Sequence, residues 1–293
     1  MSFVFLLALT ALTAQSGPPS TAQLTARLQS IIATSGAEVA VAFRSLDGSA
    51  EALIDADKVF HAASTMKVPV MIELFRQAQE GTLKLDDSLA ITNEFRSIVD
   101  GSTYQLSVGD DSDREVYGNV GKTMTLRALC EAMITVSSNF AANLLIEKLD
   151  VRKIRATVTR LGADGMQVLR GVEDQKAFDK GMNNSTTARG LMVLLEKLGR
   201  GQAVSPSADA EMIEILKRQK FNDAIPAGVP AGTPVAHKTG TITRVHHDAA
   251  VVYGPRPYVL VVLVRGIQDQ KQSAALIAEI SKTVWQHVSS PPQ

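Results

Sequence analysis

The chain has almost no cysteine, no excess of charge of either sign and no long apolar run in its body. Its one cysteine, Cys130, cannot close a disulfide within the chain and lies in an apolar stretch, where a buried apolar role is the ordinary one. Thirty Lys and Arg balance thirty Asp and Glu, so net charge favours neither nucleic acid nor an anionic membrane as a partner. The 293 residues suit one large domain or two closely joined ones.

The N-terminus has the features of an export signal. Residues 3–14 form a short apolar stretch, and Ala14-Gln15-Ser16 is a suitable cleavage site. We therefore expect residues 1–16 to be a signal peptide and the mature protein to be secreted or periplasmic. The segment before the apolar stretch lacks Lys and Arg, so the alternative is a buried N-terminal helix. No other stretch approaches the ~18 apolar residues that span a bilayer, so we expect no membrane span after signal removal.

The order of the elements predicts the fold. Alternating residues and the turn Asp47-Gly48 predict a hairpin near the start of the chain, helices fill the middle, and strands return after Pro234. The expected helices are 23–34, 64–80, 126–135, 140–149, 152–161, 187–198, 208–219 and 273–288; the expected strands are 38–43, 51–54, 235–238, 248–253 and 258–264. Residues 93–122 and 165–184 are expected to be irregular.

This order is typical of an α+β fold, with an antiparallel sheet formed from both chain ends, flanked by helices, and an inserted all-helical subdomain. We expect the sheet subdomain to comprise residues 20–62 and 220–290 and the helical subdomain residues 63–219. A cleft at their interface is the natural place for a site.

The first chemical signal is Ser64-Thr65-Met66-Lys67. Residues three apart share a helix face, so the Lys67 amine can reach the Ser64 hydroxyl. A serine becomes a nucleophile when a base takes its proton, and an amine does so when its pKa is depressed. The motif alone is weak, because Ser and Lys fall at this spacing by chance in many helices.

Two further motifs strengthen it. Ser137-Ser138-Asn139 lies between two expected helices, where it either enters a cleft or merely caps the next helix. Lys238-Thr239-Gly240-Thr241 follows strand-like sequence, where a cation and a hydroxyl can bind a carboxylate and Gly240 leaves room for a flat substrate. The backbone N–H groups of Ser64 and Thr241 can then form an oxyanion hole.

In this order, the three motifs resemble the signature of class A β-lactamases and penicillin-binding serine hydrolases. The resemblance implies that Ser64 is acylated, Lys67 is a base or proton relay, and Ser137 passes a proton to the leaving nitrogen. It implies substrate contacts for the residues Asn139, Lys238, Thr239, Gly240 and Thr241. It also implies a small-molecule β-lactam substrate and no metal or organic cofactor; we expect a monomer.

A fourth element concerns hydrolysis of the acyl-enzyme. Class A enzymes use a loop glutamate to activate the water, and Glu173 lies at the matching place. The segment departs from the family pattern: Arg170 and Glu173 are one residue further apart than usual, and no Asn follows at the usual place. Asn184 is expected to pair with Arg170 in place of the usual acid, and Arg244 is a candidate for the family's additional cation.

A second departure is Ser138, which stands where the family has an acidic residue.

Other functions are kept as alternatives. A D-alanyl-D-alanine carboxypeptidase, or another penicillin-binding serine hydrolase, would use the same scaffold. A non-catalytic module that binds cell-wall peptides is a different class, and the retained motif residues argue against it. The histidines show no metal-ligand spacing, and His246-His247 on a strand would face opposite ways. An α/β-hydrolase is disfavoured because the sequence has no G-x-S-x-G.

Overall fold

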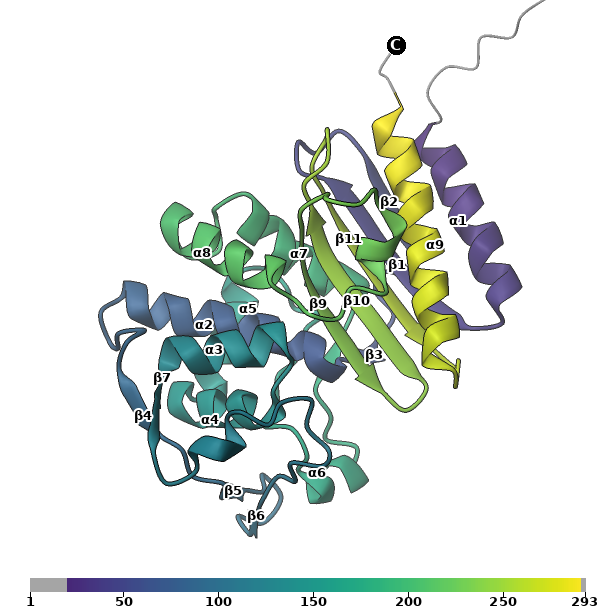
Figure 1. Cartoon of the computed structure of the whole chain (residues 1–293). Coiled ribbons are helices and arrows are strands. Elements are labelled where there is room, and N and C mark those ends of the chain that lie inside the picture. Colours follow the sequence, from purple (N-terminus) through teal and green to yellow (C-terminus); the bar gives the residue numbers. More distant parts are fainter. Residues whose placement is uncertain (1–19, 291–293) are drawn as a thin grey trace, which may run out of the picture.

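A five-stranded antiparallel sheet is built from the two ends of the chain, in the order β2-β1-β11-β10-β9. The computed structural model describes residues 20–290, so the expected signal peptide lies outside the described residues. The strands are β1 (Glu38–Ser45), β2 (Glu51–Ile54), β9 (Val235–Ile242), β10 (Val245–Val252) and β11 (Tyr258–Arg265). The predicted α+β fold class is confirmed by this sheet and its flanking helices (Figure 1).

Both faces of the sheet are covered, which gives three layers. Along β11, Val259 and Val261 belong to one apolar cluster while Leu260 and Val262 belong to the other, as the period of two in a strand requires. Helices α1 (Thr21–Ser35) and α9 (Gln270–Ser289) pack together over one face (Figure 1). The opposite face is covered by α7 (Ala188–Gly199) and α8 (Pro206–Lys217).

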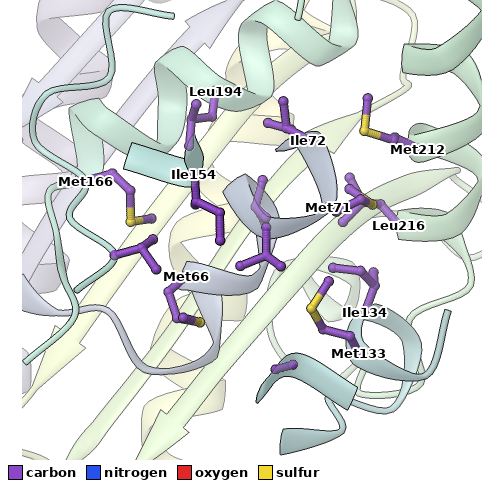
Figure 2. Packing of buried hydrophobic residues seen from close by; sticks show 14 of the residues in the cluster. Met66, Met71, Ile72, Met133, Ile134, Ile154, Met166, Leu194, Met212 and Leu216 are labelled. Carbon is purple, nitrogen blue, oxygen red and sulfur yellow. The ribbon is translucent and has the colours of Figure 1, made fainter. Parts of the chain in front are cut away.

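The remaining helices form a group beside the sheet, centred on α2 (Lys67–Gln79). Helices α3 (Leu126–Thr135), α4 (Asn139–Leu149) and α5 (Val151–Arg160) contact α2. Their shared core is rich in methionine, whose unbranched side chain fills irregular gaps. Figure 2 shows Met71 of α2 and Met66 just before it, with Met133, Met166 and Met212 from other segments around them. The turn that precedes α2, residues 63–66, packs against β9 and β10, so the start of α2 lies between the helices and the sheet.

A buried carboxylate lies inside this helical group. Glu73 on α2 is 0% exposed and accepts hydrogen bonds from Arg76 (2.7 Å), Gln77 (2.6 Å) and Thr157 (2.7 Å). Although burial opposes ionisation, these hydrogen bonds hold the pKa of Glu73 below its usual value. The carboxylate therefore joins α2 to α5 through charged hydrogen bonds.

We expect Glu73→Ala to lower the free energy of unfolding by about 3 kcal/mol, because it leaves a cavity and buried donors without partners. Glu80→Ala is the matched control: Glu80 pairs with the same Arg76 but is half exposed, and such pairs contribute about 0–1 kcal/mol. Urea unfolding of both variants measures the difference. Equal losses would show that the buried network has no special role.

Several segments differ in detail from the expectation. The helix expected from residue 64 starts as a short 3-10 turn, η1 (Ala63–Met66), before α2 begins. The strand expected over 235–238 continues to Ile242, because the hairpin to β10 turns at Thr243 and Arg244, the latter with φ 58°.

The expected irregular segments carry short pairings: β3 (Phe60–His61) with β8 (Ser185–Thr186), β4 (Ser88–Ala90) with β7 (Thr123–Thr125), and β5 (Phe95–Arg96) with β6 (Thr103–Tyr104). The other short elements are the 3-10 turns η2 (Tyr117–Asn119) and η3 (Ile225–Gly228) and the helix α6 (Gln175–Asp179).

Candidate active site

Ser64 lies in a tight turn between β3 and α2, at the junction of the sheet and the helices. The preceding Ala63 has φ 46°, a conformation that non-glycine residues seldom adopt. Two hydrogen bonds hold the turn: the Ala63 N–H donates to Nδ1 of His61 (3.0 Å), and the Thr65 hydroxyl donates to the Ala62 carbonyl (2.6 Å). The Ser64 hydroxyl is thereby presented at the beginning of a helix.

Lys67 is completely buried, and its Nζ lies within 3.2 Å of four oxygens. These are Oγ of Ser64 (3.0 Å), the carbonyl and Oγ of Ser137 (2.6 and 3.2 Å) and Oδ1 of Asn139 (2.8 Å). Burial lowers the pKa of Lys67 to about 7, although the charges of Asp111 and Glu173 act in the opposite direction. The lowered pKa makes the neutral amine, which a proton acceptor for Ser64 must be, more accessible than in an exposed lysine.

Lys238 approaches the same point from β9. Its Nζ donates to Oγ of Ser137 (3.0 Å) and to the carbonyl of Thr239 (2.9 Å). Burial and the neighbouring Lys67 charge both lower the pKa of Lys238. The Ser137 hydroxyl thus lies between two amines, an arrangement through which a proton can pass.

The edge strand β9 lies directly against the serine turn, and Gly240 makes this approach possible. A Cβ at Gly240 would lie 3.1 Å from the backbone nitrogens of both Ser64 and Thr65. A side chain there would force the turn to move by a few tenths of an ångström, so close packing rather than φ favours glycine.

Two cavities open beside Ser64 and share Ser64, Asn139 and Thr241. One, of about 340 Å³, is also lined by His61, Glu173, Phe178 and Ile242, together with other residues of the segment 170–184. The other, of about 290 Å³, is also lined by Ser137, Thr239, His246 and Gln270, and by Asp110, Ser112, Phe221 and Asp223. A substrate at Ser64 can therefore place one part in a mainly apolar space and another in a polar one.

Glu173 faces Ser64 across the larger cavity. It has φ 62°, and its Oε1 accepts a hydrogen bond from Nδ2 of Asn139 (2.8 Å). Partial burial of the carboxylate raises its pKa, while the hydrogen bond from Asn139 opposes the rise. Asn139 consequently bridges Lys67 and Glu173, with one amide atom on each.

The segment around Glu173 is held by residues that sequence reasoning did not assign. The Val172 N–H donates to Oδ1 of Asn143 (2.6 Å), and Nδ2 of Asn143 donates back to the Val172 carbonyl (3.0 Å). On the other side, the buried Asp174 accepts from the Ser97 hydroxyl (2.8 Å) and the Ile98 N–H (2.9 Å). Glu173 is therefore clamped between α4 and the segment 93–122.

The expected pairing of Arg170 with Asn184 is wrong as a side-chain pair. The Arg170 guanidinium donates instead to Oδ1 of Asn183 (3.0 Å) and to the Met182 carbonyl (2.9 Å). Asn184 binds the Arg170 backbone, because its Nδ2 donates to the Arg170 carbonyl (3.0 Å) and its Oδ1 accepts from the N–H groups of Leu169 and Arg170. Two amides close this segment where the sequence suggested one.

Arg244 is likewise not placed as expected. Its guanidinium donates to the Gly266 carbonyl (3.0 Å), and it lines neither cavity that contains Ser64. The basic residue from β10 in the polar cavity is His246, whose Nδ1 lies 3.0 Å from the Ser273 hydroxyl. His247, by contrast, contacts the His61 carbonyl (2.9 Å), so these two histidines face opposite ways, as predicted.

Among residues 20–290 no group of three His, Cys, Asp or Glu side chains is placed to hold a metal ion. Burial raises the pKa of Cys130 to about 12, which keeps its thiol protonated. In the described part of the chain, no helix has the length and apolar character needed to cross a membrane.

Over residues 23–288 the chain matches the family described as the beta-lactamase enzyme family. The chain belongs to this family. A beta-lactamase of Mycobacterium tuberculosis is 27% identical over 279 residues, which cover 88% of this chain and 80% of the relative. The predicted resemblance to class A beta-lactamases is confirmed.

Two solved proteins extend the comparison. An ancestral class A beta-lactamase is 27% identical with a TM-score of 0.77, covering 89% of this chain and 98% of its own. PBP-A is 26% identical with a TM-score of 0.81, covering 94% of this chain and 100% of its own. A variant of PBP-A, 25% identical with the same TM-score and coverage, was solved as an acyl-enzyme complex with penicillin G. These similarities extend over both the sheet and the helices of the beta-lactamase fold.

Proposed function

We propose that this chain is a serine β-lactamase that opens the β-lactam ring through an acyl-serine intermediate. The observation that carries the proposal is the 3.0 Å contact between Oγ of Ser64 and the buried Lys67 amine, whose pKa is lowered to about 7. Membership of the beta-lactamase enzyme family and the likeness to class A proteins support it.

In the acylation step, Oγ of Ser64 attacks the lactam carbonyl carbon and its proton passes to Lys67. The carbonyl oxygen becomes an oxyanion, for which we propose the N–H groups of Ser64 and Thr241 as donors. When the C–N bond breaks, the nitrogen takes a proton through Ser137, whose hydroxyl is 3.2 Å from Nζ of Lys67 and 3.0 Å from Nζ of Lys238. The product is an ester on Ser64.

We place the substrate carboxylate in the polar cavity of about 290 Å³. Thr239 and Thr241 line this cavity. Lys238 does not line it, because it is completely buried and its Nζ donates to Ser137. We propose that Lys238 attracts the carboxylate through its charge. The acyl side chain then lies in the larger cavity, against the residues of 170–184, where Asn139 can contact its amide.

In the deacylation step, Glu173 removes a proton from a water that attacks the ester carbonyl. The ester bond breaks, Ser64 regains a proton, and the opened product leaves. Glu173 retains accessible surface in the cavity, and Asn139 orients its carboxylate. We further propose that residues 1–16 direct export to the periplasm or medium, and that the mature enzyme acts as a monomer without metal or cofactor.

A D-alanyl-D-alanine carboxypeptidase is the second function considered, and a specific observation favours it. The segment around Glu173 is one residue longer than the class A pattern, and its closing contacts come from Asn183 and Asn184. A water placed less well would leave a long-lived penicilloyl-enzyme, which is the behaviour of a peptidase on this scaffold.

Steady-state hydrolysis distinguishes the two functions. We expect the protein, with and without EDTA, to turn over benzylpenicillin and a chromogenic cephalosporin many times per active site and to leave a diacetyl-Lys-D-Ala-D-Ala peptide uncleaved. Release of D-alanine with no turnover of either β-lactam would establish the peptidase instead. Loss of β-lactam hydrolysis in EDTA would contradict a metal-free serine mechanism.

A further inference from the structure

The turn that carries Ser137 and Asn139 is short and strained. Helix α3 ends at Thr135 and α4 begins at Asn139, and Ser137 between them has φ 61°. A non-glycine residue keeps such a conformation only where its surroundings determine it. Because Ser137 and Asn139 both contact the Lys67 amine, the contacts that hold this turn also set the geometry around that amine.

Those contacts come from a distant segment of the chain, residues 107–113. The carboxylate of Asp111 accepts from the Asn139 N–H, at 3.1 and 3.0 Å to its two oxygens, and from the Phe140 N–H (2.9 Å). The neighbouring Ser112 hydroxyl donates to the Val136 carbonyl (2.5 Å). The turn is therefore bound on both sides of Ser137 by two consecutive residues.

A carboxylate at this place has two physical effects. It satisfies N–H groups at the beginning of α4 that have no partner within the helix, and its charge is favourable at a helix N-terminus. The first turn of α4 has no acidic residue of its own, and its N-cap is Ser138, which stands where the family resemblance implies an acid. Asp111 thus brings to this turn, from the segment 93–122, a carboxylate that the motif itself lacks.

We propose that Asp111 is a positioning residue of the active site, which holds the backbone of Asn139 and Phe140 and so fixes Ser137 and Asn139 against Lys67. This inference rests on the proposed function, because it assigns Asp111 a role in acylation. It goes beyond the sequence-based expectation, in which residues 93–122 were irregular and none of them was assigned to the site.

Asp111 also acts on Lys67 through its charge. Three charged groups interact with the Lys67 amine: Asp111 and Glu173, whose charges raise its pKa, and Lys238, whose own pKa the charge of Lys67 lowers. Removing the Asp111 charge should lower the pKa of Lys67 further. A residue that served only to hold the loop would leave this titration unchanged.

The experiment compares Asp111→Ala and Asp111→Asn with Asp113→Ala. Asp113 is the matched control: it is buried in the same loop and accepts from two backbone N–H groups, those of Glu115 (2.9 Å) and Val116 (3.4 Å), but these lie within the loop itself. We expect Asp111→Ala to lower the single-turnover acylation rate constant for a chromogenic cephalosporin by about 10–100-fold, as small displacements of reacting groups do.

Asp111→Asn should lose less, since one amide oxygen can still accept from both N–H groups, and Asp113→Ala should acylate near the wild-type rate. The second readout is NMR titration of the ¹³Cε resonance of Lys67. It should titrate at lower pH in Asp111→Asn than in the wild type, and at the wild-type pH in Asp113→Ala.

Equal acylation by the wild type and Asp111→Ala would overturn the inference and leave the proposed function intact. A wild type that is never acylated would overturn the proposed function. In that case the NMR titration still tests the charge that Asp111 exerts on Lys67, because an unchanged Lys67 titration in Asp111→Asn contradicts that part of its role.

Discussion

Glu173→Gln is expected to slow hydrolysis of the acyl-enzyme by about 10²–10⁴-fold, the usual contribution of a general base. Gln keeps an oxygen that can accept from Nδ2 of Asn139, so the segment should keep its shape while losing its proton acceptor. Acylation should proceed nearly as in the wild type. A burst of one equivalent of penicillin per enzyme, followed by a very slow phase, is the expected kinetic signature.

The pH dependence of deacylation provides a second view of Glu173. Because partial burial raises the pKa of Glu173, its ionised form is lost at a higher pH than for an ordinary glutamate. Wild-type deacylation should therefore weaken on acidification before an exposed carboxylate would titrate.

Asp179→Asn, which removes an exposed carboxylate from the same segment, is the control for Glu173→Gln and should leave turnover unchanged. Wild-type turnover by Glu173→Gln would mean that another group activates the water.

Lys67→Met should lower the acylation rate constant by about 10²–10⁴-fold, since it removes the amine that accepts the Ser64 proton. Met has a similar length and suits a buried position. In the wild type, with the pKa of Lys67 at about 7, acylation should rise as pH increases through that value, because the charged amine present below it cannot accept a proton. This rise should be absent from the residual rate of Lys67→Met.

Lys67→Arg separates the charge of this residue from its basicity. Arg stays charged at all accessible pH values, so it keeps a cation near Ser64 without a proton acceptor. We expect it to acylate as poorly as Lys67→Met, measured by stopped flow, with circular dichroism as the check on folding. A fast Lys67→Arg variant would show that a positive charge, rather than proton transfer, is what Ser64 needs.

The fold was accessible from sequence because its strands and helices have different periods. The alternation around Asp47-Gly48 and the apolar runs after Pro234 are signals of buried strands. The helical spacing between them favoured a sheet formed from both chain ends, with the helices inserted beside it. The extension of β9 through Gly240 was missed, since Thr, Gly and Thr resemble a turn when read locally. Its strand conformation follows from pairing with β10, for example Thr241 opposite His246, which is a long-range contact.

The residues of the candidate site were likewise predictable only where a local sequence motif marks them. Ser64, Lys67 and Ser137 were found because their motifs are short and their order along the chain is specific; the structure brings them together with Lys238. Asp111 was passed over because an acidic loop resembles a solvated surface. Its contact with Asn139 joins residues 28 positions apart, and no local pattern encodes that proximity.

The larger result is that the segment 93–122 supports both halves of the proposed reaction. Ser97 and Ile98 bind Asp174, next to the proposed base for deacylation, and Asp111 binds the turn next to the proposed base for acylation. An active site whose motif departs from its family at Ser138 and around Glu173 is thus held by contacts from outside the motif.

The central claim is that Ser64 carries the acyl group, and intact-protein mass spectrometry after rapid acid quenching tests it most directly. Wild type mixed with benzylpenicillin should show, within the first turnovers, a species heavier by the mass of the penicillin, mapped by peptide digestion to Ser64, which then decays to free enzyme. Ser64→Ala should show no such species. An adduct on another residue, or hydrolysis by Ser64→Ala at the wild-type rate, would contradict the account.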